Sequence, residues 1–256
     1  MGQIVSQYVF APPKPTYDEH HPYPVTFLTT KSKKMIPCYY LKASKDTPTT
    51  IIYSHGNAAD IGAMFDFLVV LRDYLNVNVL HYEYVGYGLA NQYQPSESDT
   101  YESAEAAYEY LTKAQKVNPK DIVIFGTSVG SGPSCYLANK YPIKGLILEC
   151  PFVSICRIVS SSVFLRPVDM FCNINRIPNV KAPVIIFHGT NDDVVPYDHG
   201  KELYNNVNPR YQYKFVSIEN GSHHDIIERL TLKTYIQILR GFLAHLDNPT
   251  QEKPSQ

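Results

Sequence analysis

The chain has 256 residues and a formal net charge of −1 at pH 7, with 44% hydrophobic and 18% charged residues. This composition is typical of a packed globular protein and too apolar for a disordered one. A near-neutral charge does not supply the clustered Lys and Arg of a nucleic-acid surface, so we expect no nucleic-acid partner. No apolar run approaches the roughly 18 residues that cross a bilayer. Five cysteines without CxxC spacing favour reduced thiols and a cytoplasmic location.

The two ends of the chain differ in composition from the rest. Residues 1–24 are rich in Pro and His, and we interpret them as an N-terminal arm over the surface. Residues 248–256 (NPTQEKPSQ) are polar and contain Pro, which predicts a disordered tail. We expect residues 25–247 to form one domain.

Short β-branched runs alternate with helical patterns along this domain. An antiparallel pair is predicted first, over about 25–30 and 36–43. Runs that suit buried strands follow at 49–56, 77–84, 121–126, 145–150, 183–189 and 213–219. Helical patterns lie at 61–75, 98–115, 131–141, 199–206 and 225–246. Asp99 is the predicted N-cap of the second helix, because Glu102 three residues later completes a capping box.

This alternation predicts an α/β fold with a mostly parallel central sheet and right-handed crossovers. In such sheets the functional groups gather at the carboxyl ends of the strands. One of these ends carries residues 126–130 (GTSVG), a G-x-S-x-G pattern with a strand before it and a helix after it. That context is typical of a nucleophile elbow, so we interpret Ser128 as a nucleophile. The alternative is a glycine-rich loop with a surface serine.

A serine hydroxyl needs a base within hydrogen-bond reach before it can attack. Asp192 and His223 each follow a predicted strand, in the chain order Ser, Asp, His that this fold uses. We predict that His223 is the base and that Asp192 orients its imidazole. Asp193 and His224 are adjacent alternatives for these roles. The structural alternative for each of these candidates is a solvated loop residue or a helix N-cap. Asp225 has the pattern of such a cap.

Acyl transfer also needs two N–H donors for the oxyanion. Val129, which follows the nucleophile, supplies one, and we assign the other to Asn57 in the loop after the strand at 49–56. His55 in the same loop is expected to brace it. The sequence has no HxxxH or HExxH spacing and no phosphate-binding glycine loop, so we expect no metal and no cofactor.

Several motifs in this order resemble the α/β-hydrolase superfamily, and more narrowly its depalmitoylase (acyl-protein thioesterase) group. They are SHGNAADIG (54–62), EYVGYG (83–88), FGTSVGSGPS (125–134), HGTNDDVV (188–195) and GSHHDI (221–226). The resemblance implies a hydrolytic enzyme and places the same three roles on Ser128, Asp192 and His223. Two departures stand out: the first cysteine is Cys38, whereas the group's mammalian members have an N-terminal acylated cysteine cluster, and Glu83 replaces the usual Asp.

The first six residues, MGQIVS, fit the M-G-x-x-x-[ST] myristoylation pattern, which makes Gly2 a candidate lipidation site. The alternative is an ordinary cytoplasmic start. One myristoyl chain binds membranes only marginally, so a second signal is needed. Lys31, Lys33 and Lys34 are a candidate basic patch, and together these features predict peripheral association with the cytosolic face of a membrane.

The segment at about 152–181 is expected to form a cap over the site, because it leaves the same edge of the sheet. Its apolar residues either pack on the sheet or form an acyl-accepting groove; they are Phe152, Val153, Ile155, Ile158, Val159, Val163, Phe164, Leu165, Met170 and Phe171. We therefore predict a serine hydrolase acting on an acylated protein or lipid ester, foremost a depalmitoylase. A carboxylesterase, lipase or peptidase with the same triad, and a catalytically silent scaffold, are the alternatives.

Overall fold

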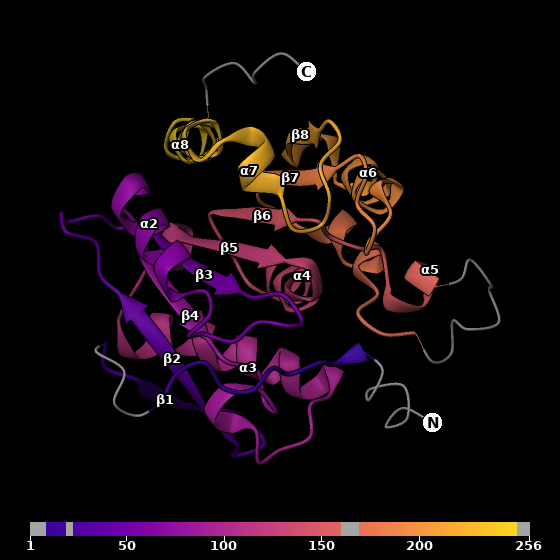
Figure 1. Cartoon of the computed structure of the whole chain (residues 1–256). Helices are drawn as coiled ribbons and strands as arrows, with labels where there is room; N and C mark the ends of the chain where they lie inside the picture. The colour runs from indigo at the N-terminus through magenta and orange to yellow at the C-terminus, as the bar shows by residue number, and fades with distance from the viewer. Residues whose placement is uncertain (1–8, 19–22, 160–168, 250–256) are drawn as a thin grey trace.

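The computed structural model describes residues 9–18, 23–159 and 169–249. A single eight-stranded sheet of order β1-β2-β4-β3-β5-β6-β7-β8 runs through it (Figure 1). The strands are β1 (Thr26–Thr29), β2 (Met35–Leu41), β3 (Thr50–Ser54), β4 (Asn78–Tyr82), β5 (Ile122–Thr127), β6 (Gly145–Glu149), β7 (Val184–Gly189) and β8 (Gln212–Ile218). The β1–β2 and β2–β4 pairs are antiparallel and all the others are parallel. The predicted α/β-hydrolase fold, with its antiparallel pair at one edge, is confirmed.

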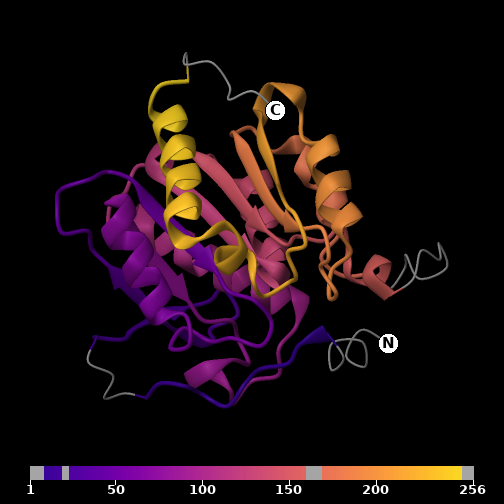
Figure 2. The same ribbon diagram turned by 45° about the horizontal axis from the view of Figure 1, so that its top comes forward.

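Helices cover both faces of the sheet (Figure 2). They are α2 (Phe65–Leu75), α3 (Glu97–Glu109), α4 (Ser131–Lys140), α5 (Ile155–Val159), α6 (Tyr197–Asn206), α7 (Ile226–Leu230) and α8 (Leu232–Asp247). Residues of α3, α4 and α6 share one apolar core, and residues of α2, α7 and α8 share the other. The sheet is thus buried on both sides, which explains why its inner strands are continuously apolar.

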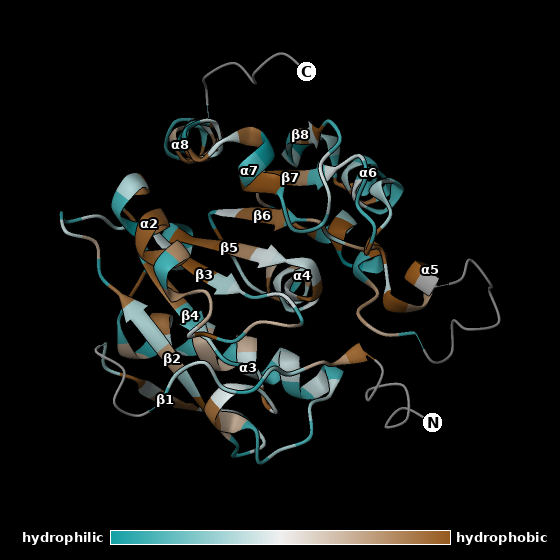
Figure 3. Ribbon diagram, in the orientation of Figure 1, coloured by the Kyte–Doolittle hydropathy of each residue, from teal (hydrophilic) through white to brown (hydrophobic). Residues whose placement is uncertain are grey.

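The strand β7 illustrates how one sequence serves both cores. Val184 and Ile186 belong to the core under α3, α4 and α6, whereas Ile185 and Phe187 belong to the other. This two-residue alternation is the pleat of a strand. The hydropathy colours agree, because β6 and β7 are hydrophobic along most of their length and α6 and α8 mix both kinds of residue (Figure 3).

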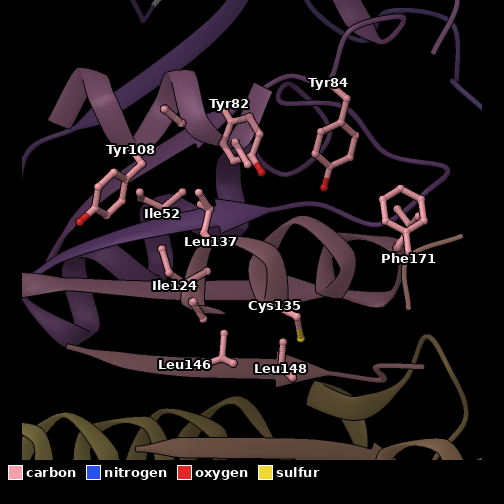
Figure 4. Close-up of a cluster of buried hydrophobic side chains, with 14 of the residues drawn as sticks. Ile52, Tyr82, Tyr84, Tyr108, Ile124, Cys135, Leu137, Leu146, Leu148 and Phe171 are labelled. Atoms are coloured by element: carbon pink, nitrogen blue, oxygen red, sulfur yellow. The ribbon is translucent and has the colours of Figure 1, made fainter. Parts of the chain in front are cut away.

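The core beneath α4 holds the nucleophile turn in place. Ile52, Ile124 and Leu148, from three neighbouring strands, point into the layer that contains Cys135 and Leu137 of α4 (Figure 4). All five side chains are fully buried. Cutting back one of these Ile or Leu side chains to Ala costs about 2–5 kcal/mol of stability. The strand and the helix on either side of the turn therefore form a tightly packed support.

The helix predicted at 61–75 begins only at Phe65, and two further helix predictions also differ from the structure. The N-cap of α3 is Ser96 and not Asp99: Ser96 has an extended backbone, and its hydroxyl accepts the Asp99 N–H at 3.1 Å. The predicted second half of the capping box also fails, because Glu102 accepts the Ser32 N–H at 2.7 Å instead. The helix predicted at 225–246 is broken at Thr231, whose φ of 64° ends α7 before α8 begins.

The chain ends are described only in part. Gly2, residues 250–256 of the predicted tail, and the cap residues Val163, Phe164 and Leu165 lie outside the described residues. Over the described ranges, no helix combines the length and apolarity that a bilayer crossing requires. Within the described part of the arm, residues 9–18 pack closely on the domain, with Phe10 and Tyr17 each only 6% exposed.

Candidate active site

The turn after β5 places Ser128 at the carboxyl edge of the sheet. Its φ of 52° lies in the left-handed region, which costs a residue with a side chain about 1–3 kcal/mol and persists only where the surroundings enforce it. The flanking glycines show the enforcement. A Cβ at Gly126 would collide with the Gly130 carbonyl, and a Cβ at Gly130 would collide with the main chain at the end of β3. The close packing of β3, β5 and α4 therefore requires this tight turn.

The three residues predicted to act together are joined by hydrogen bonds. Nε2 of His223 lies 2.9 Å from Oγ of Ser128, and its Nδ1 lies 2.8 Å from Oδ2 of Asp192. The second Asp192 oxygen lies 3.0 Å from the same nitrogen. The His223 side chain is 6% exposed and that of Asp192 is fully buried. The residues come from the loops after β5, β7 and β8, so the parallel sheet brings them together.

The environment of Asp192 favours the ionised carboxylate. Burial by itself raises its pKa, but hydrogen bonds from His188 and His223, together with the Val195 N–H at 2.7 Å, outweigh burial and hold the pKa well below its usual value. The Val194 N–H adds a further bond at 3.0 Å. Asp192 is therefore charged at neutral pH and able to stabilise a protonated imidazole at His223.

The adjacent alternatives lie outside this relay. Asp193 and His224 are both exposed, and the ring of His224 makes only an edge contact with His223, at 5.0 Å between centroids. Asp225 stands at the N-cap of α7, as the pattern indicated, but its carboxylate accepts the Ser222 N–H at 2.6 Å and does not cap the helix.

Two further residues touch Asp192 that the sequence reasoning missed. Nε2 of His188 lies 2.9 Å from the Val195 carbonyl, which can only accept, so this nitrogen carries the proton that also faces Asp192 at 3.2 Å. The Sγ of the buried Cys150 lies within 4.8 Å of an Asp192 oxygen, and its thiol donates to the His223 carbonyl at 3.9 Å. A signal for both existed in the strand ends: Glu149 pairs with Phe187, so the next residues, Cys150 and His188, lie side by side.

Cys150, His188 and Asp192 place one potential metal-ligand atom each within 4.8 Å of one another. The donors do not suit a divalent cation. Burial raises the pKa of the Cys150 thiol well above its usual value, and the His188 nitrogen that faces the group is protonated. Metal ligands must be deprotonated, so a protonated thiol and a protonated ring nitrogen beside one carboxylate do not make a metal-binding site.

The two residues predicted to donate to the oxyanion lie in segments next to Ser128. Val129 is the second residue of a short 3₁₀ turn, where a main-chain N–H has no partner within the helix. The Asn57 N–H donates to no described residue. Its loop reaches the nucleophile, because a Cβ added to Gly56 would lie 3.8 Å from the Ser128 Cβ. The structure thus brings the loop and the serine turn together.

His55 holds the loop from beneath. It is fully buried, with Nε2 2.9 Å from Oε1 of Glu83 and Nδ1 2.8 Å from the Gly56 carbonyl. Neither nitrogen bonds to Ser128, as expected of a bracing residue. Glu83, the residue that departs from the depalmitoylase pattern, also accepts the Ile61 N–H at 3.2 Å, so its carboxylate fixes both ends of the loop.

The sheet order and the serine turn define an α/β-hydrolase, and comparison with known proteins agrees. The family model for phospholipases and carboxylesterases matches residues 84–240. A protein of Acanthamoeba polyphaga mimivirus named as an α/β hydrolase, L404, is 38% identical over 193 residues, which are 75% of this chain and 73% of that one. The human α/β hydrolase domain-containing protein 17B is 31% identical over 251 residues, covering 88% of this chain and 86% of that one.

Among solved structures, the esterase Pf2001 of Pyrococcus furiosus has a TM-score of 0.73 at 15% identity, over 92% of this chain and 97% of that one. At this identity the likeness concerns the fold alone. The sequence matches carry the assignment further: the chain belongs to the phospholipase/carboxylesterase family of α/β-hydrolases, a family of hydrolytic enzymes.

Proposed function

We propose that this protein is a serine hydrolase that cleaves acyl esters or thioesters through Ser128, His223 and Asp192, and that its substrates are long-chain acylated proteins. The observation that carries the proposal is the unbroken relay of hydrogen bonds from Ser128 Oγ through His223 to Asp192. In this relay the Ser128 hydroxyl, which can donate its proton, faces Nε2 of His223, which can accept it as a general base does.

The reaction proceeds in two halves. Ser128 Oγ attacks the acyl carbonyl while Nε2 of His223 takes its proton, and the N–H groups of Asn57 and Val129 stabilise the oxyanion. His223 then gives the proton to the leaving alcohol or thiol, which leaves an ester on Ser128. Water attacks this acyl-enzyme with His223 again as base, the carboxylic acid leaves, and the proton returns to Ser128. Asp192 stays ionised throughout.

The long-chain thioester preference rests on the motifs that resemble depalmitoylases. The described part of the cap segment limits the number of residues that an acyl chain can contact. Phe152, Val153 and Phe171 are almost fully buried in the core, as the packing alternative expected. Ile155 and Ile158 of α5 are half-buried, so part of each side chain is available to line a groove.

Membrane association forms a separate part of the proposal. We propose that Gly2 is myristoylated and that exposed Lys31 and Lys33 add a weak electrostatic contact. Lys34 contributes less, because its ammonium pairs with Asp99 at 2.5 Å. Intact mass after expression in a eukaryotic cell tests this: myristoylation adds about 210 Da to the Met-free chain, and an unmodified chain contradicts it.

The substrate class is tested by hydrolysis of p-nitrophenyl esters and S-acyl peptides of graded chain length. We expect turnover of palmitoyl thioesters to exceed that of acetyl thioesters, and Ser128→Ala to lose it. A preference for acetate would contradict the long-chain assignment. If the wild type cleaves peptide bonds but not S-acyl peptides, the peptidase alternative is favoured. If the wild type hydrolyses none of these substrates, the catalytically silent scaffold is favoured.

A further inference from the structure

The loop that carries Asn57, residues 55–60, is held by the N-terminal arm. The Asn57 side chain is the first anchor point. Its Oδ1 accepts the Ala11 N–H at 2.9 Å, and its Nδ2 donates to the Val9 carbonyl at 2.7 Å. Among the described residues, the other partner of this amide is the Tyr87 hydroxyl, which donates to Oδ1 at 2.6 Å. Two of these three hydrogen bonds thus join the amide to residues almost fifty positions earlier in the chain.

Asp60, at the far end of the same loop, is the second anchor point. It is fully buried, and its Oδ2 accepts the Thr16 N–H at 2.7 Å. The Thr16 hydroxyl donates to its other oxygen. Since a buried carboxylate is costly unless its oxygens are satisfied, these bonds fix the arm and the loop to each other.

The third anchor point acts through Glu83, the partner of His55. The hydroxyl of Tyr17 donates to Oε2 of Glu83 at 3.0 Å and accepts the Leu89 N–H at 3.2 Å. Because Oε1 of Glu83 holds the His55 ring, Tyr17 supports the start of the loop. All three long polar side chains of residues 55–60 are therefore tied, directly or through one carboxylate, to the arm.

The arm is also seated by packing. Phe10, between Val9 and Ala11, is 6% exposed and makes edge contacts with Tyr87 and Phe171 at 6.4 and 5.9 Å between ring centroids. The arm is therefore packed into the domain at Phe10, between the two residues whose main-chain groups bond to Asn57, and does not merely lie on the surface. This seat holds the Val9 carbonyl and the Ala11 N–H in place on Asn57.

From these contacts we propose that Val9, Ala11, Thr16 and Tyr17, the arm anchors, are positioning residues that aim the Asn57 N–H at the developing oxyanion. The inference rests on the proposed function. An oxyanion donor acts only when it lies about 2.7–3.1 Å from the developing charge, and a functional group must be held within about 0.5 Å of its productive position. The arm supplies that restraint from outside the loop.

The test is Asn57→Ala, which keeps the main-chain N–H and removes both hydrogen bonds between the Asn57 side chain and the arm. We expect kcat for a p-nitrophenyl ester to fall about 10-fold or more, up to the roughly 10²–10³-fold of a deleted donor, with KM within about twofold of wild type. Inhibition by phenylboronic acid, which forms a tetrahedral adduct on the serine, should weaken in parallel. The acid limb of the pH profile should not move, because His223 and Asp192 are untouched.

A matched pair on the arm covers the case in which Asn57→Ala fails to fold. Thr16→Val removes the hydroxyl that bonds to Asp60 and should lower kcat several-fold. Thr16→Ser keeps a hydroxyl at this position and should have a kcat close to wild type. Lys14→Ala, a change at an exposed residue of the arm, is the control. Wild-type kcat in both Asn57→Ala and Thr16→Val, or a lower kcat with unchanged boronate affinity, would overturn the proposal. A wild type that neither turns over nor reacts with a fluorophosphonate would contradict the proposed function, and this inference with it.

Discussion

Two of the buried histidine–carboxylate pairs at the carboxyl edge of the sheet have nearly the same nitrogen–oxygen distance. His223 lies 2.8 Å from Asp192, and His55 lies 2.9 Å from Glu83. They differ in what faces the other ring nitrogen. For His223 it is the Ser128 hydroxyl at 2.9 Å, and for His55 it is the Gly56 carbonyl at 2.8 Å.

That difference distinguishes His223, the proposed general base, from His55, which holds the loop. A carbonyl can only accept, so Nδ1 of His55 must carry a proton and is committed to the loop. A hydroxyl can donate, so Nε2 of His223 is able to accept the Ser128 proton. The carboxylate partner alone therefore does not identify a catalytic histidine; the group on the other nitrogen does.

The largest expected effect comes from removing the proposed base. We expect His223→Ala to lower kcat by about 10⁴–10⁶-fold, because Ser128 then has no acceptor for its proton. The melting temperature should also fall, because the change leaves the buried Asp192 carboxylate without its His223 partner, but the variant should remain folded at the assay temperature. Steady-state hydrolysis of a p-nitrophenyl ester and a thermal melt measure the two quantities. A variant that retains more than a tenth of wild-type kcat would contradict the assignment.

Asp192→Asn sharpens the same comparison with an isosteric change. An amide cannot stabilise the imidazolium and favours the wrong tautomer, so we expect a loss of about 10⁴-fold in kcat. The matched change at the other pair, Glu83→Gln, should cost less than about tenfold. Equal losses in the two variants would mean that the pairs do not have different roles.

For His55→Ala we expect an effect on stability more than on chemistry. The change leaves the fully buried Glu83 carboxylate without its ring partner, and breaking a buried pair in this way costs about 3–5 kcal/mol. Urea denaturation of His55→Ala and wild type measures the difference. A free energy of unfolding within about 1 kcal/mol of wild type would show that the loop does not depend on this brace.

The pH dependence of stability follows from the lowered pKa of Asp192. Burial opposes ionisation, but the hydrogen bonds from His188 and His223 prevail. A carboxylate with a lowered folded pKa contributes stability above its unfolded pKa of about 3.9, and this contribution is lost as the pH falls towards the folded pKa. The stability gap between wild type and Asp192→Asn should therefore narrow below about pH 4. Urea titrations from pH 7 to pH 3 measure it, and a constant gap would contradict the assignment.

The smallest expected effect is that of Cys150→Ala. The change removes a thiol that donates weakly to the His223 carbonyl and leaves the hydrogen bonds of Asp192 in place, so kcat should fall about two- to tenfold. Burial raises the pKa of this thiol, so iodoacetamide should leave it unmodified in the folded protein at pH 8. Rapid alkylation, read by mass spectrometry, would show that the thiol is more accessible than the structure indicates.

The sheet and the three residues of the relay could be predicted because short stretches of sequence mark the strands and the residues that follow them. Continuous apolar runs mark strands buried on two faces, and a serine between glycines after such a run marks a strained turn. Ser128, Asp192 and His223 could be chosen because each follows a strand, and parallel strands bring their carboxyl ends to one edge.

What the sequence did not predict depends on contacts between distant residues. Nothing near Asn57 in the chain indicates that Val9 and Ala11 hold its side chain. The cap of α3 was misplaced for a local reason, because Ser96 and Asp99 are both good capping residues and only the backbone conformation at Ser96 decides between them.

The most direct test of the central claim is to treat the wild type with a fluorophosphonate and map the adduct by peptide mass spectrometry. We expect a single adduct on Ser128, formed rapidly in the wild type and at a rate reduced by orders of magnitude in His223→Ala, while His55→Ala retains labelling as long as it remains folded. An adduct on another residue, or an equal labelling rate in wild type and His223→Ala, would contradict the account.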